Sequence, residues 1–307
     1  SFEGVRQIEL DVFYDPTGTL FRPFGVPGYK VLHIEVIDEG STCELFVACL
    51  AELEAWSRAR PAHMPIAVLV EIKDTQSFPV GPLPVPVGPA ELDVLDDEIR
   101  SIFPEDRLIP PDLVRDGRPT LEAAVLEGAW PAIDDVRGDV IFLLDNKRDA
   151  YRAGRPSLEG RVAFTPSTPG QPDAAFVKVN DPLGANTAWI SQLVTDGYVV
   201  RTRADTPVRT VLDGDVSQRD AALASGGQWV STDYPVPERA ARWGSTYVAQ
   251  IPGGNPARCN PINAPVGCTA AMIEDLPPEQ RPVPSPPPTG PAPAAATAGA
   301  VAPAFTG

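Results

Sequence analysis

The feature that most constrains this chain is a repeated alternation of short apolar runs with stretches of helical periodicity. Residues 65–71 and 139–144 are nearly continuous apolar runs, as expected of strands buried on both faces. Strand and helix alternate at least six times, a rhythm that predicts parallel strands joined by crossover helices. The expected strands are 7–13, 30–36, 65–71, 139–144, 175–179, 198–202 and 228–232, and the expected helices are 43–60, 90–103, 120–136, 184–196 and 217–224.

Charged residues at the strand ends favour a (β/α)₈ barrel over an open doubly wound sheet. Glu71, Asp145, Arg201 and Asp233 stand at or just past carboxyl ends of expected strands, the face on which such barrels carry chemistry. A doubly wound sheet is the second choice, because no Gly-rich phosphate loop follows an early strand. Seven strands are recognisable, and Ser1 comes only a few residues before the first. We therefore expect an α/β TIM barrel that lacks its first strand because the sequence is incomplete at its N-terminus.

The chain divides by composition into a long globular part and a short tail. Its 307 residues are ample for one large core. We expect residues 1–276 to form a catalytic barrel and residues 277–307, rich in Pro and Ala and nearly without charge, to be disordered. No apolar run in the sequence is long enough to span a bilayer.

The charge and the cysteines narrow the possible partners and compartment. A formal net charge of −16 argues against a nucleic-acid partner and against simple electrostatic attraction to an anionic membrane. The four cysteines form two local pairs, Cys43 with Cys49 and Cys259 with Cys268. Such pairs favour disulfides and an oxidising compartment, and the alternative is four free buried thiols.

The strand 7–13 carries a candidate metal site. Its alternation puts Glu9 and Asp11 on one face, where two carboxylates repel unless a cation or a proton lies between them. The ordinary alternative is a solvated strand face. With Glu71 from a neighbouring strand end, these oxygens suit Ca²⁺. His33 stands on the expected strand 30–36 as one of two histidines, for which a structural role is the ordinary alternative.

Five stretches together resemble a known enzyme family: GVRQIELDVF, KVLHIEVIDEGSTC, HMPIAVLVEIKDT, DVIFLLDNK and GGQWVSTDYP. In this order they resemble the calcium-dependent phosphoinositide-specific phospholipases C, above all the secreted bacterial branch. The resemblance runs from Gly4 to about Cys268. It implies a TIM barrel that cleaves phosphatidylinositol to diacylglycerol and inositol 1,2-cyclic phosphate or inositol 1-phosphate. It also implies a Ca²⁺ cofactor, peripheral contact with a membrane surface and secretion by a bacterium, and we expect a monomer.

The resemblance also implies residue roles. The implied metal ligands are Glu9, Asp11 and Glu71, and His33 matches one of two catalytic histidines. Glu9 or Asp11 would accept a proton from the attacking hydroxyl. Lys147 matches a cation on the substrate side, and Arg201 matches an arginine that approaches the inositol hydroxyls. We expect Lys73 to help orient the substrate, with a salt bridge to a neighbouring acid as the alternative, and Arg203 to be structural.

One departure from the family affects the expected activity. The family's first histidine lies in a His-Asn motif on the first strand, and both residues are missing before Ser1. The chain as given is therefore expected to be inactive or nearly so. Two other functions stay open: a glycerophosphodiester phosphodiesterase, which shares a barrel and a Glu-x-Asp strand, and a catalytically inactive barrel that binds inositol lipids or glycans.

Overall fold

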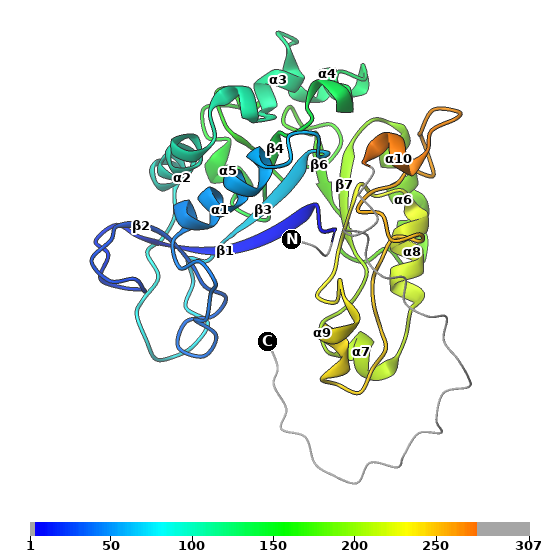
Figure 1. Cartoon of the computed structure of the whole chain (residues 1–307). Helices are drawn as coiled ribbons and strands as arrows, with labels where there is room; N and C mark the ends of the chain where they lie inside the picture. Colours follow the sequence, from blue (N-terminus) through cyan, green and yellow to red (C-terminus); the bar gives the residue numbers. More distant parts are fainter. Residues whose placement is uncertain (1–3, 275–307) are drawn as a thin grey trace.

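The computed structural model of the chain describes residues 4–274, which form a mixed α/β fold on two sheets (Figure 1). The expected disordered tail, 277–307, lies outside the described residues. The first sheet has the order β2-β1-β3-β4-β5 and the second β6-β7-β8. Their strands are β1 (Gln7–Asp15), β2 (Gly28–Val31), β3 (Ile66–Ile72), β4 (Val140–Leu144), β5 (Ala163–Phe164), β6 (Phe176–Lys178), β7 (Val199–Arg203) and β8 (Trp229–Ser231).

Most neighbouring strands run parallel, as the alternation of strand and helix predicts. Ladders of parallel pairing join β1 to β3, β3 to β4, β4 to β5, β6 to β7 and β7 to β8. A parallel bridge between Pro166 and Phe176 continues this direction from the first sheet into the second. Within residues 4–274 no ladder joins β8 back to β1, so a closed barrel is not formed by the described part of the chain.

The second expected strand differs from its prediction. It spans Gly28–Val31 instead of 30–36, and it pairs antiparallel with β1, Val12 opposite Val31 and Asp15 opposite Gly28. The physical reason is its connection: the segment between β1 and β2 contains no helix, and a parallel pairing needs a crossover. Consequently β2 is a hairpin partner of β1, and His33 lies beyond its end.

The helices cover the sheets from outside (Figure 1). Contacts join α1 to α2, α2 to α5, and α6 to both α8 and β7. The helices are α1 (Phe46–Arg58), α2 (Pro89–Ile102), α3 (Pro111–Arg115), α4 (Leu121–Leu126), α5 (Arg148–Tyr151), α6 (Ala185–Thr195), α7 (Arg209–Asp213), α8 (Ser217–Ser225), α9 (Pro237–Ala241) and α10 (Ala270–Ile273), with 3₁₀ turns η1 (Glu105–Arg107) and η2 (Ile133–Asp135).

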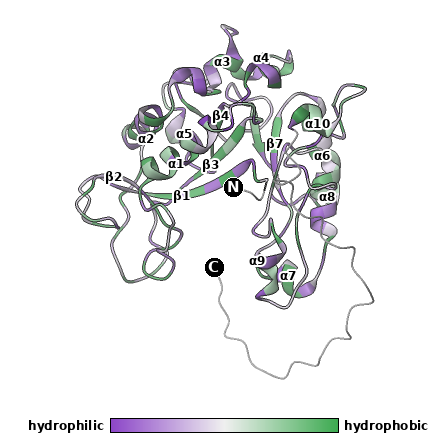
Figure 2. Cartoon of the chain, viewed as in Figure 1, coloured by the Kyte–Doolittle hydropathy of each residue, from purple (hydrophilic) through white to green (hydrophobic). Residues whose placement is uncertain are grey.

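One buried apolar cluster extends through both sheets. It contains Val68 of β3, Phe142 of β4, Phe176 of β6 and Val200 of β7, each at most 2% exposed. Figure 2 shows β3 and β4 in hydrophobic colours, whereas part of β1 is hydrophilic. The strands that the sequence marks as continuous apolar runs are therefore the centre of the core, and β1 carries charged residues beside them.

The helix expected over 120–136 is much shorter in the structure. Thr120 caps α4 by accepting a hydrogen bond from the amide of Ala123, and the helix ends at Leu126. Gly128 has a φ of 77°, which takes the chain out of the helix two residues later. Trp130 then packs on Phe164 and donates its indole N–H to the carbonyl oxygen of Gly197. The helix therefore ends early, and the turn at Gly128 brings Trp130 into contact with Phe164.

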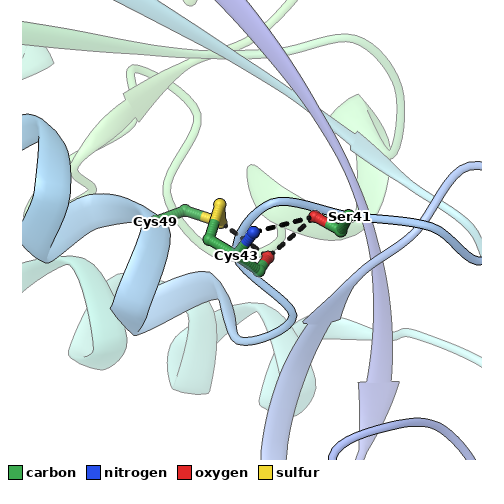
Figure 3. The surroundings of a disulfide bond; sticks show 3 residues. All are labelled: Ser41, Cys43 and Cys49. Carbon is green, nitrogen blue, oxygen red and sulfur yellow. Dashed lines mark hydrogen bonds between the residues drawn. A yellow bond between two sulfur atoms is a disulfide. The ribbon is translucent and has the colours of Figure 1, made fainter.

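Both predicted disulfides are present, Cys43–Cys49 and Cys259–Cys268. The first joins the segment before α1 to the first turn of that helix, and Ser41 exchanges hydrogen bonds with the backbone of Cys43 (Figure 3). Helix α1 begins at Phe46, later than the expected residue 43, because Leu45 before it is extended and Cys43 lies in a bend. In the described range we find no helix with the length and apolar character needed to cross a bilayer.

Candidate active site

The three predicted metal ligands lie together. Because β1 and β3 are parallel neighbours, their register places Asp11 directly opposite Glu71. Glu9 stands two residues before Asp11 on the same face of β1. One oxygen from each of the three carboxylates lies within 4.8 Å of the others, a spacing at which they could hold a metal ion. The fold therefore brings the three carboxylates together, and their role as metal ligands stays a prediction.

The cluster has the electrostatics of a cation site. Burial, together with the neighbouring Glu71 carboxyl, raises the pKa of Asp11 to about 7. Burial also acts to raise the pKa of Glu71, but hydrogen bonds from Lys73 and Asp11 outweigh it and lower that pKa. Oxygen Oδ1 of Asp11 is buried and accepts no hydrogen bond, although Lys73 Nζ lies 3.2 Å away. The oxygens therefore have unused capacity for a hard cation.

Lys73 lies between these two acids. Its Nζ is 2.8 Å from Glu71 Oε1 and 3.2 Å from Asp11 Oδ1. This is the salt-bridge arrangement that the sequence left open, and it places one positive charge beside two of the three carboxylates. A cation entering the cluster would meet this ammonium as a competitor.

Arg201 joins the second sheet to the first. Its guanidinium donates to Glu9 Oε2 at 2.9 Å, to Asn180 Oδ1 at 2.6 Å and to Ser231 Oγ at 2.7 Å, and its side chain is 4% exposed. Ser231 in turn donates to Gln7 Oε1 at 2.7 Å. Burial raises the pKa of Glu9, and the charge of Arg201 opposes this shift. The structure thus places Arg201 beside the acidic cluster, with each of its three nitrogens already donating a hydrogen bond.

Two lysines at strand ends, Lys147 and Lys178, are also bound to acids. Lys147 follows β4, adopts a left-handed backbone and bonds to Asp74. Lys178, at the end of β6, donates to Asp145 Oδ2 at 2.7 Å. The sequence analysis did not single out Lys178. Its signal was a lone lysine in the apolar run AFVKV, the same kind of signal that marked Lys73.

His33 lies in the loop after β2. Its side chain is 57% exposed, and Nδ1 is 2.8 Å from Asp38 Oδ2. A bridge between Ile34 and Asp38 turns the chain back here, so His33 sits on a turn instead of a strand. It nevertheless lines the same open cleft, of about 1200 Å³, as the acidic cluster and Arg201. The other histidine, His63, is 3% exposed and bonds Ser57 and the carbonyl of Met64, a structural role.

Comparison with known proteins decides the family. A family model described as "Phosphoinositide phospholipase C, Ca2+-dependent" matches residues 22–261, which is most of the chain. The chain belongs to this family of calcium-dependent phosphoinositide phospholipases C. The matched range begins after Glu9 and Asp11, which the fold brings beside Glu71 within it.

Solved phospholipases of the same kind resemble the fold. A Ca²⁺-dependent phosphatidylinositol-specific phospholipase C from Streptomyces antibioticus has a TM-score of 0.53 and 21% identity, covering 76% of this chain and 86% of its own. A calcium-dependent phosphoinositol-specific phospholipase C from Pseudomonas sp. has a TM-score of 0.47 and 18% identity, covering 68% and 78%. A search of curated proteins gave no match. The mixed α/β fold is thus similar to that of the Streptomyces antibioticus enzyme.

Proposed function

We propose that this protein is a phosphatidylinositol-specific phospholipase C that depends on Ca²⁺. The products would be diacylglycerol and inositol 1,2-cyclic phosphate, with further hydrolysis giving inositol 1-phosphate. The observation that carries the proposal is the gathering of Glu9, Asp11 and Glu71 in an open cleft of a chain of this family. We assign the catalytic unit to residues 1–276.

Glu9, Asp11 and Glu71 would hold the calcium ion. Three carboxylates on two rigid, parallel strands match the oxygen donors that Ca²⁺ prefers, and the orphaned Asp11 Oδ1 is an acceptor ready for it. When bound, Ca²⁺ lowers the pKa of a nearby hydroxyl and offsets negative charge on phosphate oxygens. Arg201 would keep Glu9 in place through its 2.9 Å contact, because its other donors fix the guanidinium to Asn180 and Ser231.

The reaction moves two protons. The inositol 2-hydroxyl attacks the adjacent phosphorus, the new O–P bond forms, and the bond to the glycerol oxygen breaks. Glu9 would accept the hydroxyl proton, and the raised pKa of its carboxyl suits it to that task. His33 would donate a proton to the departing glycerol oxygen, with Asp38 holding Nδ1 and leaving Nε2 for the transfer.

Lys73 and Lys147 are proposed to orient the substrate. Both line up with acids in the absence of a ligand, Lys73 with Glu71 and Lys147 with Asp74. If Glu71 and Asp11 held the calcium ion, the Lys73 ammonium would lose these partners and could contact a phosphate oxygen of the substrate.

A membrane contact is proposed next to the cleft. Two loops leave the site, one after β2 and one after β3, and their sides meet: the amide of Phe78 donates to Glu35 Oε1 at 3.2 Å (Figure 1). Their exposed apolar residues form what we call the apolar rim: Val36 at 46%, Ile37 at 56%, Val80 at 58% and Leu83 at 71% exposure. His33 lies three residues before this rim, so a lipid headgroup held there would reach the site. The two disulfides support a secreted enzyme.

The function is tested by cleavage of phosphatidylinositol vesicles, with Ca²⁺ and with chelator. We expect chelator-sensitive release of inositol 1,2-cyclic phosphate, and a loss of at least about 100-fold in Glu71→Gln. Glu52→Gln is the matched control, because Glu52 is exposed on α1 and away from the cleft. Calcium binding with no release of inositol phosphates would instead favour an inactive barrel that binds lipid. Hydrolysis of glycerophosphoinositol to glycerol 3-phosphate and inositol, with no cleavage of the vesicles, would favour the glycerophosphodiesterase reaction.

The membrane contact is tested by vesicle sedimentation. Leu83→Asp and Ile37→Asp should each weaken binding to phosphatidylinositol vesicles by about 10-fold, because each removes apolar area and adds charge. Hydrolysis of a soluble, short-chain substrate should be unchanged. Leu126→Asp is the control, since Leu126 is 56% exposed on α4, outside the rim. Equal losses in all three variants would reject a specific rim contact.

A further inference from the structure

The carboxyl end of β7 carries two arginines on one face. Strand alternation puts Arg201 and Arg203 on the same side, with Thr202 on the other. Both arginines line the open cleft, whereas Thr202 is fully buried. The sequence suggests a structural role for Arg203, but its surroundings point to another one.

Arg203 differs from its neighbours by its lack of partners. The other strand-end cations, Lys73, Lys147, Lys178 and Arg201, each contact a carboxylate at 3.2 Å or less. Across residues 4–274, Arg203 Nε is buried without a hydrogen-bond acceptor, and no acidic side chain forms an ion pair with its guanidinium. A buried donor without a partner costs about 1–3 kcal/mol, and a guanidinium keeps its charge at any ordinary pH.

An anion bound in the cleft would supply the missing acceptor. The guanidinium is a planar fork that matches two oxygens of one phosphate group, so a phosphate is the anion that best fits an unpaired arginine. The chain has a formal net charge of −16, which repels anions in general. A phosphate would therefore bind only beside a local cation such as Arg203.

The contact between Arg201 and Glu9 indicates where Arg203 lies along the cleft. Arg201 contacts Glu9, and two residues further along their strands come Arg203 and Asp11. Because the strands run in the same direction, each step of two residues advances about 6.6 Å toward the carboxyl edge. Arg203 thus lies nearer the carboxyl edge than the Arg201–Glu9 contact, and it lines the same cleft as Asp11 and Glu71.

We infer that Arg203 binds the phosphodiester group of the lipid headgroup and positions the phosphorus opposite the acidic cluster. This inference rests on the proposed function, and it assigns to Arg203 a substrate contact while Arg201 stays bound to Glu9. The bridging phosphate would complete the hydrogen bonds of Arg203 only when substrate is present. A positive charge alone is not sufficient for this contact, because the guanidinium makes two parallel hydrogen bonds to the phosphate and the ammonium of a lysine cannot.

The test compares ligands that differ by one phosphate. Binding of inositol 1-phosphate and of myo-inositol is measured by calorimetry for the wild-type chain, Arg203→Gln, Arg203→Lys and the control Arg209→Gln, whose side chain is 82% exposed on α7. We expect Arg203→Gln to weaken inositol 1-phosphate about 10- to 100-fold and to leave myo-inositol unchanged, with only partial recovery in Arg203→Lys. KM for phosphatidylinositol should rise in Arg203→Gln, and its Tm should not fall.

Three outcomes would overturn the inference. Equal affinity of Arg203→Gln and wild type for inositol 1-phosphate would remove the phosphate contact while leaving the proposed function intact. Equal losses for both ligands would show a general effect on the cleft. Inorganic phosphate bound as tightly as inositol 1-phosphate by the wild type would assign Arg203 to a free anion. A wild type that neither binds inositol 1-phosphate nor cleaves lipid would reject the proposed function itself.

Discussion

The buried ion pair between Arg6 and Glu274 should be a main determinant of stability. Arg6 immediately precedes β1, and Glu274 follows α10, so the pair ties the two ends of the described chain together. Arg6 Nε donates to Glu274 Oε2 at 2.8 Å, and the side chains are 5% and 9% exposed. Met64 adds its amide to the same carboxylate at 3.2 Å. The strand that carries Glu9 and Asp11 therefore begins at this contact.

Removing the carboxylate charge leaves a buried guanidinium without its counter-ion. Breaking a buried pair from one side costs about 3–5 kcal/mol. In a domain of this size each kcal/mol lowers Tm by about 2–4 °C, so Glu274→Gln should melt about 6–20 °C below wild type. The double variant Arg6→Met with Glu274→Met should lose less stability than the sum of the single changes, because no unpaired charge remains.

The assay is thermal unfolding followed by circular dichroism, with urea unfolding for the free-energy difference. Asp213→Asn is the control, because Arg209 and Asp213 also form an ion pair but are 82% and 58% exposed. Such surface pairs contribute little, and we expect Tm to change by less than about 2 °C. If Glu274→Gln melted as close to wild type as the control does, burial would not be what gives the Arg6–Glu274 pair its importance.

Three further predictions concern a buried acid, a disulfide and a lysine. Burial raises the pKa of Glu98 to about 7, so protonation of this carboxyl stabilises the folded state as pH falls from 7 toward 4.5. Glu98→Gln should therefore be more stable than wild type at pH 8, by up to about 3 kcal/mol, and equally stable at pH 4.5. Lower stability of Glu98→Gln than of wild type at pH 8, measured by urea unfolding, would contradict this. Cys43→Ser with Cys49→Ser opens a loop of 6 residues' separation and should cost about 2 kcal/mol, read as a lower Tm; reductant should then lower the Tm of the variant only through Cys259–Cys268, and so by less than in wild type. Lys73→Met should tighten calcium binding about 10-fold in calorimetry while turnover falls, since it removes the ammonium beside Glu71 and Asp11; weaker binding would argue that Lys73 organises the cluster.

The acidic cluster was predictable because it depends on pattern alone. Period-two alternation fixed the shared face of Glu9 and Asp11, and the alternation of strand and helix made β1 and β3 parallel. Once β3 is a continuous buried run, its end must come beside Asp11, and Glu71 is that end. The resemblance to the family then implied that the ion held by these carboxylates is Ca²⁺.

The position of His33 was not predictable in the same way. The run KVLHIEV has the composition of a strand, but its partner is β1 in an antiparallel hairpin, and the pairing ends at Val31. Which residues pair is set by the loop before β2, whose shape depends on tertiary contacts such as Phe21 packing on Phe13. The sequence run therefore indicated β structure without fixing its partner or its length.

The pairing of the strand-end cations was also beyond the sequence. Arg201 and Arg203 are equivalent in pattern, yet only Arg201 meets Glu9, because the choice depends on the height at which the strands of the two sheets face each other. Lys178 of β6 contacts Asp145, which follows β4, and this pairing likewise depends on how far each strand extends along the cleft. Strand β5 was missed because two residues are too few to show any period.

The link between β1 and the second sheet is made of side chains, through Arg201 with Glu9 and Ser231 with Gln7. A backbone ladder would fix the separation of two strands at a single value, but a side-chain link has a length that depends on which residues form it. The width of this cleft is therefore set by four side chains, those of Arg201, Glu9, Ser231 and Gln7. A shorter or longer residue at Gln7 or Ser231 would change the width of the opening while every backbone ladder stayed as it is. Single substitutions in this link can therefore reshape the cleft and leave the backbone of both sheets unchanged.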